Sequence, residues 1–235
     1  MEKRTKSLGD NRLQTIKLNI TSVDEVADVM KKVDVTINEA YYELNLTAMH
    51  AAMKAKVPLI DLGGLYSITK EQLSLHDEVR KAGTLVILGM GSDPGTSNIL
   101  CKFGSDKLDK TDEIHIRYGS SCRGLTFTFA VGTILNEATE SAIVFENGKF
   151  LEIPPFSRVE DTIFRSPVGL QKTYIIRHSE LATIPKLIRG VKTVTYYDSW
   201  DPEVCIDPDK YLNELVKRRI ELYETHVQTK KLVLT

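Results

Sequence analysis

The feature that most constrains the fold is the alternation of short apolar runs with helical spacing over the first hundred residues. Four runs of aliphatic and β-branched residues are predicted strands: residues 14–20, 34–38, 57–61 and 84–90. Between them, apolar residues recur three and four positions apart, which is typical of amphipathic helices. This order predicts a parallel sheet covered by helices on both faces, with a ligand beyond the carboxyl ends of the strands.

The sequence also marks the ends of the predicted helices, which cover residues 23–33, 42–55 and 69–82. Thr21 or Ser22 can cap the first helix, because a side-chain oxygen accepts a hydrogen bond from an amide of its first turn. Thr69 can cap the third helix, and Gly83 suits the left-handed position that ends many helices.

Small and polar residues follow three of the predicted strands, at residues 38–41, 61–64 and 89–93. Such residues let a ligand approach the backbone closely, so three ends of this kind at one sheet edge favour a binding site over ordinary connecting turns. The most distinctive segment, residues 92–98, predicts a turn and then a capped helix through residues 99–103.

Beyond about residue 110 the pattern becomes that of an antiparallel sheet. The predicted strands cover residues 112–120, 125–131, 142–153, 173–179 and 191–198. Asn147-Gly148 within the third of them predicts a type I′ hairpin turn, and residues 180–188 and 208–228 have helical spacing. The sequence therefore predicts an α/β unit followed by an α+β domain with a mainly antiparallel sheet.

Composition excludes several functional classes. Lys and Arg number 31 against 32 Asp and Glu, and a net charge of −1 argues against a nucleic-acid binder that relies on bulk positive charge. No run approaches the roughly 18 apolar residues of a membrane helix, and the polar start carries no secretory signal. Three scattered cysteines without CxxC or HExxH spacing argue against a disulfide framework or a metal site, which predicts a cytoplasmic protein.

Two segments resemble the saccharopine dehydrogenase family, which includes saccharopine reductases and lysine 6-dehydrogenase-like enzymes. They are DVTINEAYYELNLTAMHAAMKAKVPLIDLGG and AGTLVILGMGSDPGTSNIL, where the family has a late Rossmann strand followed by a DPG turn. Residues 112–198 are similar to the family's substrate and dimerisation domain. The resemblance implies hydride transfer between NAD or NADP and a C–N bond of an amino-acid substrate, in lysine or other amino-acid metabolism, by a homodimer.

The sequence departs from the family where the cofactor pyrophosphate is held. The family begins with a strand, a GxGxxG loop and a helix, and this sequence contains no GxGxxG. Gly89-Met90-Gly91 has the wrong spacing, and Pro94 has no N–H to donate. We therefore expect an incomplete Rossmann-like domain over residues 1–97 and a C-terminally truncated domain over 98–235, a fragment that binds dinucleotide weakly or not at all by itself.

The expected gap leaves two arrangements open. The strand over 14–20 pairs directly with the strand that begins at Asp34, or another chain supplies the missing N-terminal half. If nothing covers the strand that begins at Asp34, it exposes an apolar edge.

The resemblance implies roles for residues at the strand ends. Those expected near the cofactor are Asn38, Glu39, Ala40, Tyr41, Asp61 and Gly63. Those expected near the substrate are Asp93, Pro94, Gly95 and Asn98. In the second domain, Arg117 is a further candidate for binding a substrate carboxylate, because a guanidinium offers paired donors. The alternatives are a helix-entry role for the first four, a capped turn for Asp61 and Gly63, packing for the DPG turn and a solvated surface arginine.

His178, Glu180 and Tyr174 are the candidate catalytic residues. Histidine changes charge near neutral pH, so His178 and Glu180 form a candidate acid–base pair, and Tyr174 would share the face of His178 on an extended strand. A structural histidine at a strand end is the alternative. Two other functions also remain open, a non-catalytic assembly subunit that complements a nucleotide-binding partner and a small-ligand binder that reuses the glycine turns.

Overall fold

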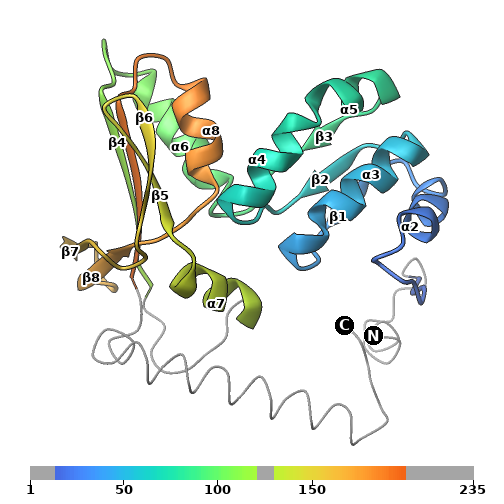
Figure 1. The fold of residues 1–235 in the computed structure, drawn as a ribbon, viewed down its shortest axis with the longest axis horizontal. Helices are drawn as coiled ribbons and strands as arrows, with labels where there is room; N and C mark the ends of the chain where they lie inside the picture. Colours follow the sequence, from blue (N-terminus) through green and yellow to red (C-terminus); the bar gives the residue numbers. More distant parts are fainter. Residues whose placement is uncertain (1–13, 121–129, 200–235) are drawn as a thin grey trace, which may run out of the picture.

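The computed structural model describes residues 14–120 and 130–199, and its first part is a small parallel α/β unit (Figure 1). Its elements, in chain order, are α2 (Val23–Met30), β1 (Thr36–Asn38), η1 (Tyr42–Leu44), α3 (Asn45–Ala55), β2 (Leu59–Asp61), α4 (Tyr66–Ser74), α5 (His76–Ala82) and β3 (Val86–Ile87). The three strands form a parallel sheet in the order β1-β2-β3. The Ser22 side chain caps α2 by accepting from the amide of Glu25, as the sequence predicts.

One face of this sheet is buried and the other is exposed. Leu59 of β2 is fully buried in a core formed with α2 and α3, and Val86 of β3 packs against the same core. The other face presents Ile37, Ile60 and Ile87 in one register row across the three strands. Ile37 is 58% exposed and Ile87 is 38% exposed, so the prediction of helices on both faces is wrong within the described residues.

Two further predictions for this unit are wrong. Residues 14–19 form no strand, because their backbone pairs with no strand in the described ranges and Leu18 instead packs against the α2–α3 core. This excludes direct pairing of that segment with β1, which lies at an edge of the described sheet. The helix expected over 69–82 begins earlier, at Tyr66, and is divided at Leu75 into α4 and α5, while Gly83 ends it as predicted with φ +71°.

The second part of the chain contains a larger, mainly antiparallel sheet. Its elements are α6 (Thr96–Ser105), β4 (Glu113–Tyr118), α7 (Val131–Thr139), β5 (Ala142–Glu146), β6 (Lys149–Ile153), β7 (Val159–Ile163), β8 (Leu170–Ile175), α8 (Glu180–Leu187) and β9 (Thr193–Ser199). The strand order is β6-β5-β9-β8-β7, and β4 pairs with β9 as the only parallel pair among the described strands of this sheet. An incomplete Rossmann-like sheet followed by an α+β domain, the predicted fold class, is therefore observed.

Helix α8 joins the two parts of the molecule. One face of the second sheet packs on α8 through a core that includes Ile176, Leu181 and Tyr196. Figure 1 shows α8 between this sheet and α4, and α8 contacts both α4 and α6. Ser97, at the start of α6, thereby reaches Glu180, the first residue of α8.

Local turn chemistry accounts for the hairpin but not for α7. Asn147 and Gly148 have φ of +50° and +76°, as the predicted type I′ turn requires. Of the strand expected over 125–131, residues 125–129 lie outside the described residues, and Val131 begins α7 instead. The helix expected over 208–228 also lies outside them. No helix in the described ranges has the length and apolar character that a membrane span requires.

Candidate functional site

Asp61 holds together the turns that follow β2 and β3. Its carboxylate is fully buried and accepts hydrogen bonds from the amides of Gly63 and Gly89, each at 2.8 Å, and from Gln72 Nε2 at 2.7 Å. These three donors satisfy the buried charge. The sequence predicts Asp61 near the cofactor. Its observed contacts are those of the alternative role, a residue that caps a turn.

Glycine is required where these turns meet the DPG segment. Gly63 has φ +98°, and a Cβ there would lie 2.3 Å from Cγ of Pro94. Gly95 has φ +127°, and a Cβ there would lie 2.2 Å from the carbonyl oxygen of Gly91. Gly63, Pro94 and Gly95 thus form one interlocked unit in which the backbones approach closely.

Asn38 continues this network to β1. Its Nδ2 donates to Asn45 Oδ1 at 2.8 Å, and its own Oδ1 accepts from the amide of Ala40 at 3.3 Å. Asn45 in turn donates to the carbonyl of Gly63 at 3.0 Å. The side chain of Asn38 therefore fixes the strand ends, while neighbouring Glu39 is exposed.

Tyr41 and Tyr42 connect the end of β1 to α7. Their rings pack edge to face with centroids 4.7 Å apart, and Tyr41 Oη donates to Glu43 at 3.3 Å. The Tyr42 hydroxyl accepts a hydrogen bond from Asn136 of α7. A Cβ on Gly132 would lie 2.6 Å from Tyr41 Oη, so α7 approaches this tyrosine closely.

The start of α6 does not offer free amides to a pyrophosphate. The Gly95 amide donates to Asn98 Oδ1 at 3.0 Å, and those of Thr96 and Ser97 donate to backbone carbonyls at 3.1 Å. A pyrophosphate loop needs such amides unpaired and directed at the ligand. The DPG turn therefore does not fit that role. Asn98 Nδ2 instead donates to Thr183 Oγ1 of α8 at 2.8 Å, which ties the turn to the second sheet's helix.

His178 and Glu180 form a buried ion pair beside the DPG turn. Glu180 is fully buried and accepts from Ser97 Oγ at 2.6 Å, while its other oxygen pairs with His178 Nδ1. The His178 ring stacks on Tyr196 with centroids 4.0 Å apart and planes 9° from parallel. Two predicted catalytic residues are thus in direct contact, and Ser97 links them to the start of α6.

The surroundings keep His178 protonated near neutral pH. Burial lowers its pKa, but the Glu180 carboxylate outweighs burial and raises the pKa of His178 to about 9. Burial also disfavours the charged form of Glu180, yet His178 and Ser97 keep its pKa below the usual value. The pair therefore consists of an imidazolium and a carboxylate. Glu180 contacts Nδ1 of His178, so the proton on Nε2 is not bonded to Glu180.

Sequence reasoning missed Glu137 of α7. It is 4% exposed, its Oε2 has no hydrogen-bond partner, and burial raises its pKa to about 7. Its charge acts on both His178 and Glu180. Burial also raises the pKa of Asp93 and Asp198, whose charges act on His178 as well. The sequence contains no signal for a functional role of Glu137, because the pattern predicts a strand over 125–131 and does not predict the helix α7 that carries Glu137.

Tyr174 and Arg117 engage other partners. Tyr174 packs edge to face on Phe156 at 5.6 Å, and β8 ends at Ile175, before the chain reaches His178. Arg117 Nε donates to Glu160 Oε2 at 2.9 Å, and its guanidinium lies over the Tyr197 ring. Within the described structure, the charge of Arg117 is therefore already paired.

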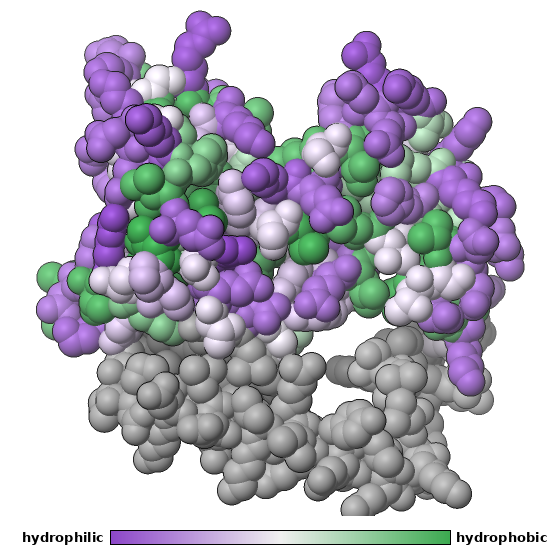
Figure 2. All heavy atoms as spheres, in the orientation of Figure 1, coloured by the Kyte–Doolittle hydropathy of each residue, from purple (hydrophilic) through white to green (hydrophobic). Residues whose placement is uncertain are grey.

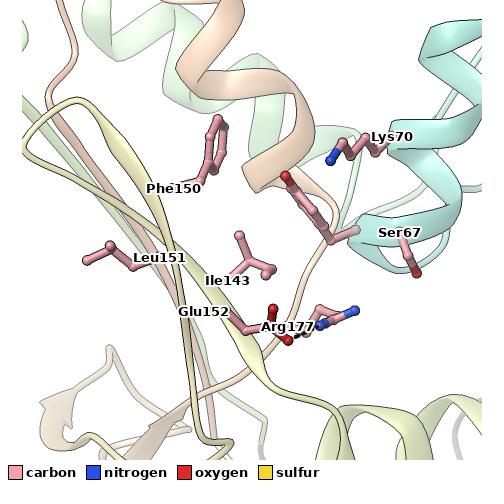
Figure 3. Close-up of a pocket in the computed structure, with 8 residues that line it drawn as sticks. Ser67, Lys70, Ile143, Phe150, Leu151, Glu152 and Arg177 are labelled. Atoms are coloured by element: carbon pink, nitrogen blue, oxygen red, sulfur yellow. Dashed lines mark hydrogen bonds and ion pairs between the residues drawn. The ribbon is translucent and has the colours of Figure 1, made fainter.

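A pocket of about 370 Å³ opens between α4 and the β5–β6 hairpin (Figure 3). Its walls include Tyr66, Lys70, Ile143, Phe150, Glu152 and Arg177. Figure 2 shows hydrophobic residues gathered over the hairpin region of this face, where Phe150 is 42% exposed. No group of three or more His, Cys, Asp or Glu residues in the described ranges is arranged to hold a metal ion.

Three comparisons relate the chain to known proteins. Residues 1–87 match the family model of the saccharopine dehydrogenase NADP binding domain. The chain is 24% identical to the carboxynorspermidine synthase of Vibrio alginolyticus over 218 residues, which is 86% of this chain and 50% of that protein. It is 24% identical over 238 residues to the carboxyaminopropylagmatine dehydrogenase of Synechocystis, covering 96% of this chain and 59% of that protein.

The fold is also shared with a solved structure. Apo saccharopine dehydrogenase (L-Glu forming) from Saccharomyces cerevisiae superimposes with a TM-score of 0.60 at 19% identity, over 84% of this chain and 46% of that one. This chain thus spans about half the length of the curated relatives it matches.

A parallel α/β unit whose strand ends meet a second, mainly antiparallel sheet defines a Rossmann-like class of two-part proteins. Within that class, residues 1–87 are similar to the NADP binding domain of saccharopine dehydrogenases.

Proposed function

We propose that this chain is part of an NAD(P)-dependent oxidoreductase that acts on the C–N bond of an amino compound. The observation that carries the proposal is the buried His178–Glu180 pair, which Ser97 at the start of α6 holds by a hydrogen bond to Glu180. The NADP binding domain match supports the cofactor class, and the curated relatives are named for carboxylated polyamine and agmatine compounds. The proposed cofactor is NAD or NADP, and the proposed substrate class is an amino compound.

In this proposal His178 supplies the proton that nitrogen requires when a C=N bond is reduced. A general acid works best when it is protonated at the operating pH and keeps a free N–H. His178 meets both conditions, since its pKa is about 9 and Glu180 occupies only Nδ1. Glu180 orients the ring, and Tyr196 fixes the ring plane.

Cofactor binding is tested by titrating the purified chain with NADPH and following its fluorescence. We expect weak binding or none by the chain alone, because the sequence has no GxGxxG and the amides of the α6 start are paired. Micromolar affinity for NADPH would contradict that expectation.

Substrate binding and chemistry are tested separately. Saccharopine is titrated calorimetrically into the chain and into His178→Gln, with His115→Gln as the control because His115 pairs with Glu113 on β4. NADPH oxidation with an amino-acid aldehyde and an amine then measures turnover. We expect His178→Gln to lose activity that His115→Gln retains, in any preparation that turns over. Equal activity of the two variants would contradict the role of His178.

An assembly subunit remains a second candidate, and the exposed sheet face favours it. Ile37 and Ile87 lie in one row with Ile60 on a face that the described residues leave uncovered. An apolar face of this kind suits a polypeptide partner, including a second copy of the chain. Light scattering after size-exclusion chromatography of the purified chain measures self-association, and a monomer of 26.4 kDa would count against a homodimer.

A further inference from the structure

The pocket between α4 and the β5–β6 hairpin combines an apolar wall with two cationic side chains (Figure 3). Phe150 and Ile143 line the hairpin side, and the Tyr66 ring lies 6.1 Å from the Phe150 ring. The volume of about 370 Å³ is at the small end of the range for ligand sites, which suits a molecule of amino-acid size.

Arg177 is a fixed cation at one side of this pocket. Its side chain is 14% exposed, its Nε donates to the carbonyl of Ser141 at 2.7 Å, and a terminal nitrogen pairs with Glu140 at 3.1 Å. The other terminal nitrogen contacts Glu152 at 3.3 Å, and the Glu152 side chain is 62% exposed. Exposed ion pairs of this kind contribute little, so Glu152 can be replaced at low cost by another carboxylate.

Lys70 is a second cation, and it has no anionic partner among the described residues. It lies on α4 with its Nζ 5.9 Å from the centroid of the Tyr66 ring. Lys70 forms no ion pair with any part of the chain that the structure describes. Two cations therefore border one pocket. Glu152, the more exposed of the two carboxylates that pair with Arg177, is the acidic residue among the described residues that line it.

We propose that this pocket binds the carboxylate end of a small ligand, which displaces Glu152 from Arg177 and pairs with Lys70. The apolar part of the ligand then rests on Phe150 and Ile143. This inference rests on the proposed function, because it identifies the pocket as the carboxylate subsite of the amino-compound substrate. It assigns substrate recognition to Arg177 and Lys70, whereas the sequence had suggested Arg117, whose charge is paired with Glu160.

The test compares butanoate with butanamide, a neutral molecule of nearly the same shape, by calorimetric titration of the full chain without cofactor. We expect butanoate to bind at least about fivefold more tightly than butanamide at low salt, because charge-assisted contacts are the stronger ones and exposed charges are screened by salt. Equal binding of the two molecules would overturn the proposal. So would an absence of butanoate binding.

Two charge-removing variants are expected to act in opposite directions. Lys70→Gln should weaken butanoate binding about three- to fivefold, the scale of one exposed ion pair. Glu152→Gln should strengthen it by a similar factor, because the variant removes the anion that competes for Arg177. The controls are Lys81→Gln on α5 and Glu113→Gln on β4, which line no part of this pocket and should leave affinity unchanged.

These outcomes separate the inference from the proposed function. A merely structural role for Lys70 and Glu152 would shift unfolding without opposite changes in affinity. If butanoate binds with this pattern while no preparation reduces a C–N bond, the pocket stands and the proposed function fails. If Glu152→Gln weakens butanoate binding or leaves it unchanged, the pocket assignment fails whatever the activity.

Discussion

Asp61 and Glu180 are both fully buried carboxylates, but they have opposite kinds of partner. Asp61 is held by two backbone amides and a carboxamide, none of which titrates. Glu180 is held by a hydroxyl and by His178, which can lose its proton. The first arrangement fixes the backbone of the strand-end turns. The second keeps a charge that responds to pH next to those turns, and this is the difference expected between a scaffold and a reactive centre.

The largest effect is expected from Asp61→Ala. This change leaves the Gly63 and Gly89 amides and Gln72 Nε2 without their buried acceptor, which should lower the free energy of unfolding by about 3–5 kcal/mol. Urea unfolding measures it, and Asp61→Asn, which keeps one acceptor oxygen, should cost less. A loss below about 1 kcal/mol for Asp61→Ala would show that the turns do not depend on this carboxylate.

Gly63→Ala is expected to come next. The new Cβ would meet Pro94 at 2.3 Å and would also require φ of +98°, so we expect a loss of about 2–4 kcal/mol. Gly83→Ala is the matched control, since Gly83 has φ +71° but nothing lies within 4 Å of its added Cβ. It should cost only about 1 kcal/mol. Equal losses from the two changes would remove the evidence for an interlock between the turns.

The His178 region should make stability depend on pH. His178 has a folded pKa of about 9, above its ordinary value of 6.5, so its contribution to stability is complete below pH 6.5 and is lost as pH rises through 9. Glu137 has a folded pKa of about 7, above 4.5, so it too favours the folded state less as pH rises from 4.5 through 7. The unfolding free energy should therefore fall by about 2 kcal/mol or more between pH 5 and pH 9.

Glu137→Gln sharpens that measurement. The glutamine cannot ionise, so the fall between pH 4.5 and 7 should become shallower. The raised pKa values of Asp93 and Asp198 still contribute there, and the fall due to His178 between 6.5 and 9 remains. Urea denaturation at fixed pH values gives both curves. A variant whose curve keeps the full decline from pH 4.5 would show that Glu137 is not the group responsible.

The smallest effect concerns the link between the two regions. Thr183→Val removes the hydroxyl that accepts from Asn98 Nδ2 and leaves a partly buried amide unpaired, which should cost about 1 kcal/mol. Thermal unfolding measures this loss, and Thr162→Val, at a threonine pair between β7 and β8, is the comparison within the second sheet. An unchanged midpoint for Thr183→Val would mean that the link contributes no stability.

Local signals in the sequence predicted most elements of the fold. Ser22 capped α2, Asn147-Gly148 formed the hairpin turn, and Gly83 ended α5 as their chemistry required. The strand predicted over 14–20 was wrong because β-propensity reflects packing against neighbours, and this segment has no partner strand in the part of the chain that the structure describes. The exposed isoleucine face could not be anticipated, because period and composition do not say which faces are covered.

The candidate site was only partly accessible from sequence. His178 and Glu180 stand two residues apart, and the chemistry of that pair was sufficient to single them out. Glu137, Lys70 and Arg177 are brought to their sites by tertiary packing of α7, α4 and the residues that follow β8. Nothing in their local sequence distinguishes them from solvated charges.

The most direct test of the central claim is the titration of the His178 imidazole, followed by NMR of its ring resonances in the wild-type chain and in Glu180→Gln. The claim is that a buried carboxylate keeps this imidazole charged at the junction of the two sheets. We predict a pKa of about 9 in the wild-type chain and a clearly lower one in Glu180→Gln. A wild-type His178 that titrates at or below its ordinary value of 6.5, or that is unaffected by Glu180→Gln, would contradict the account.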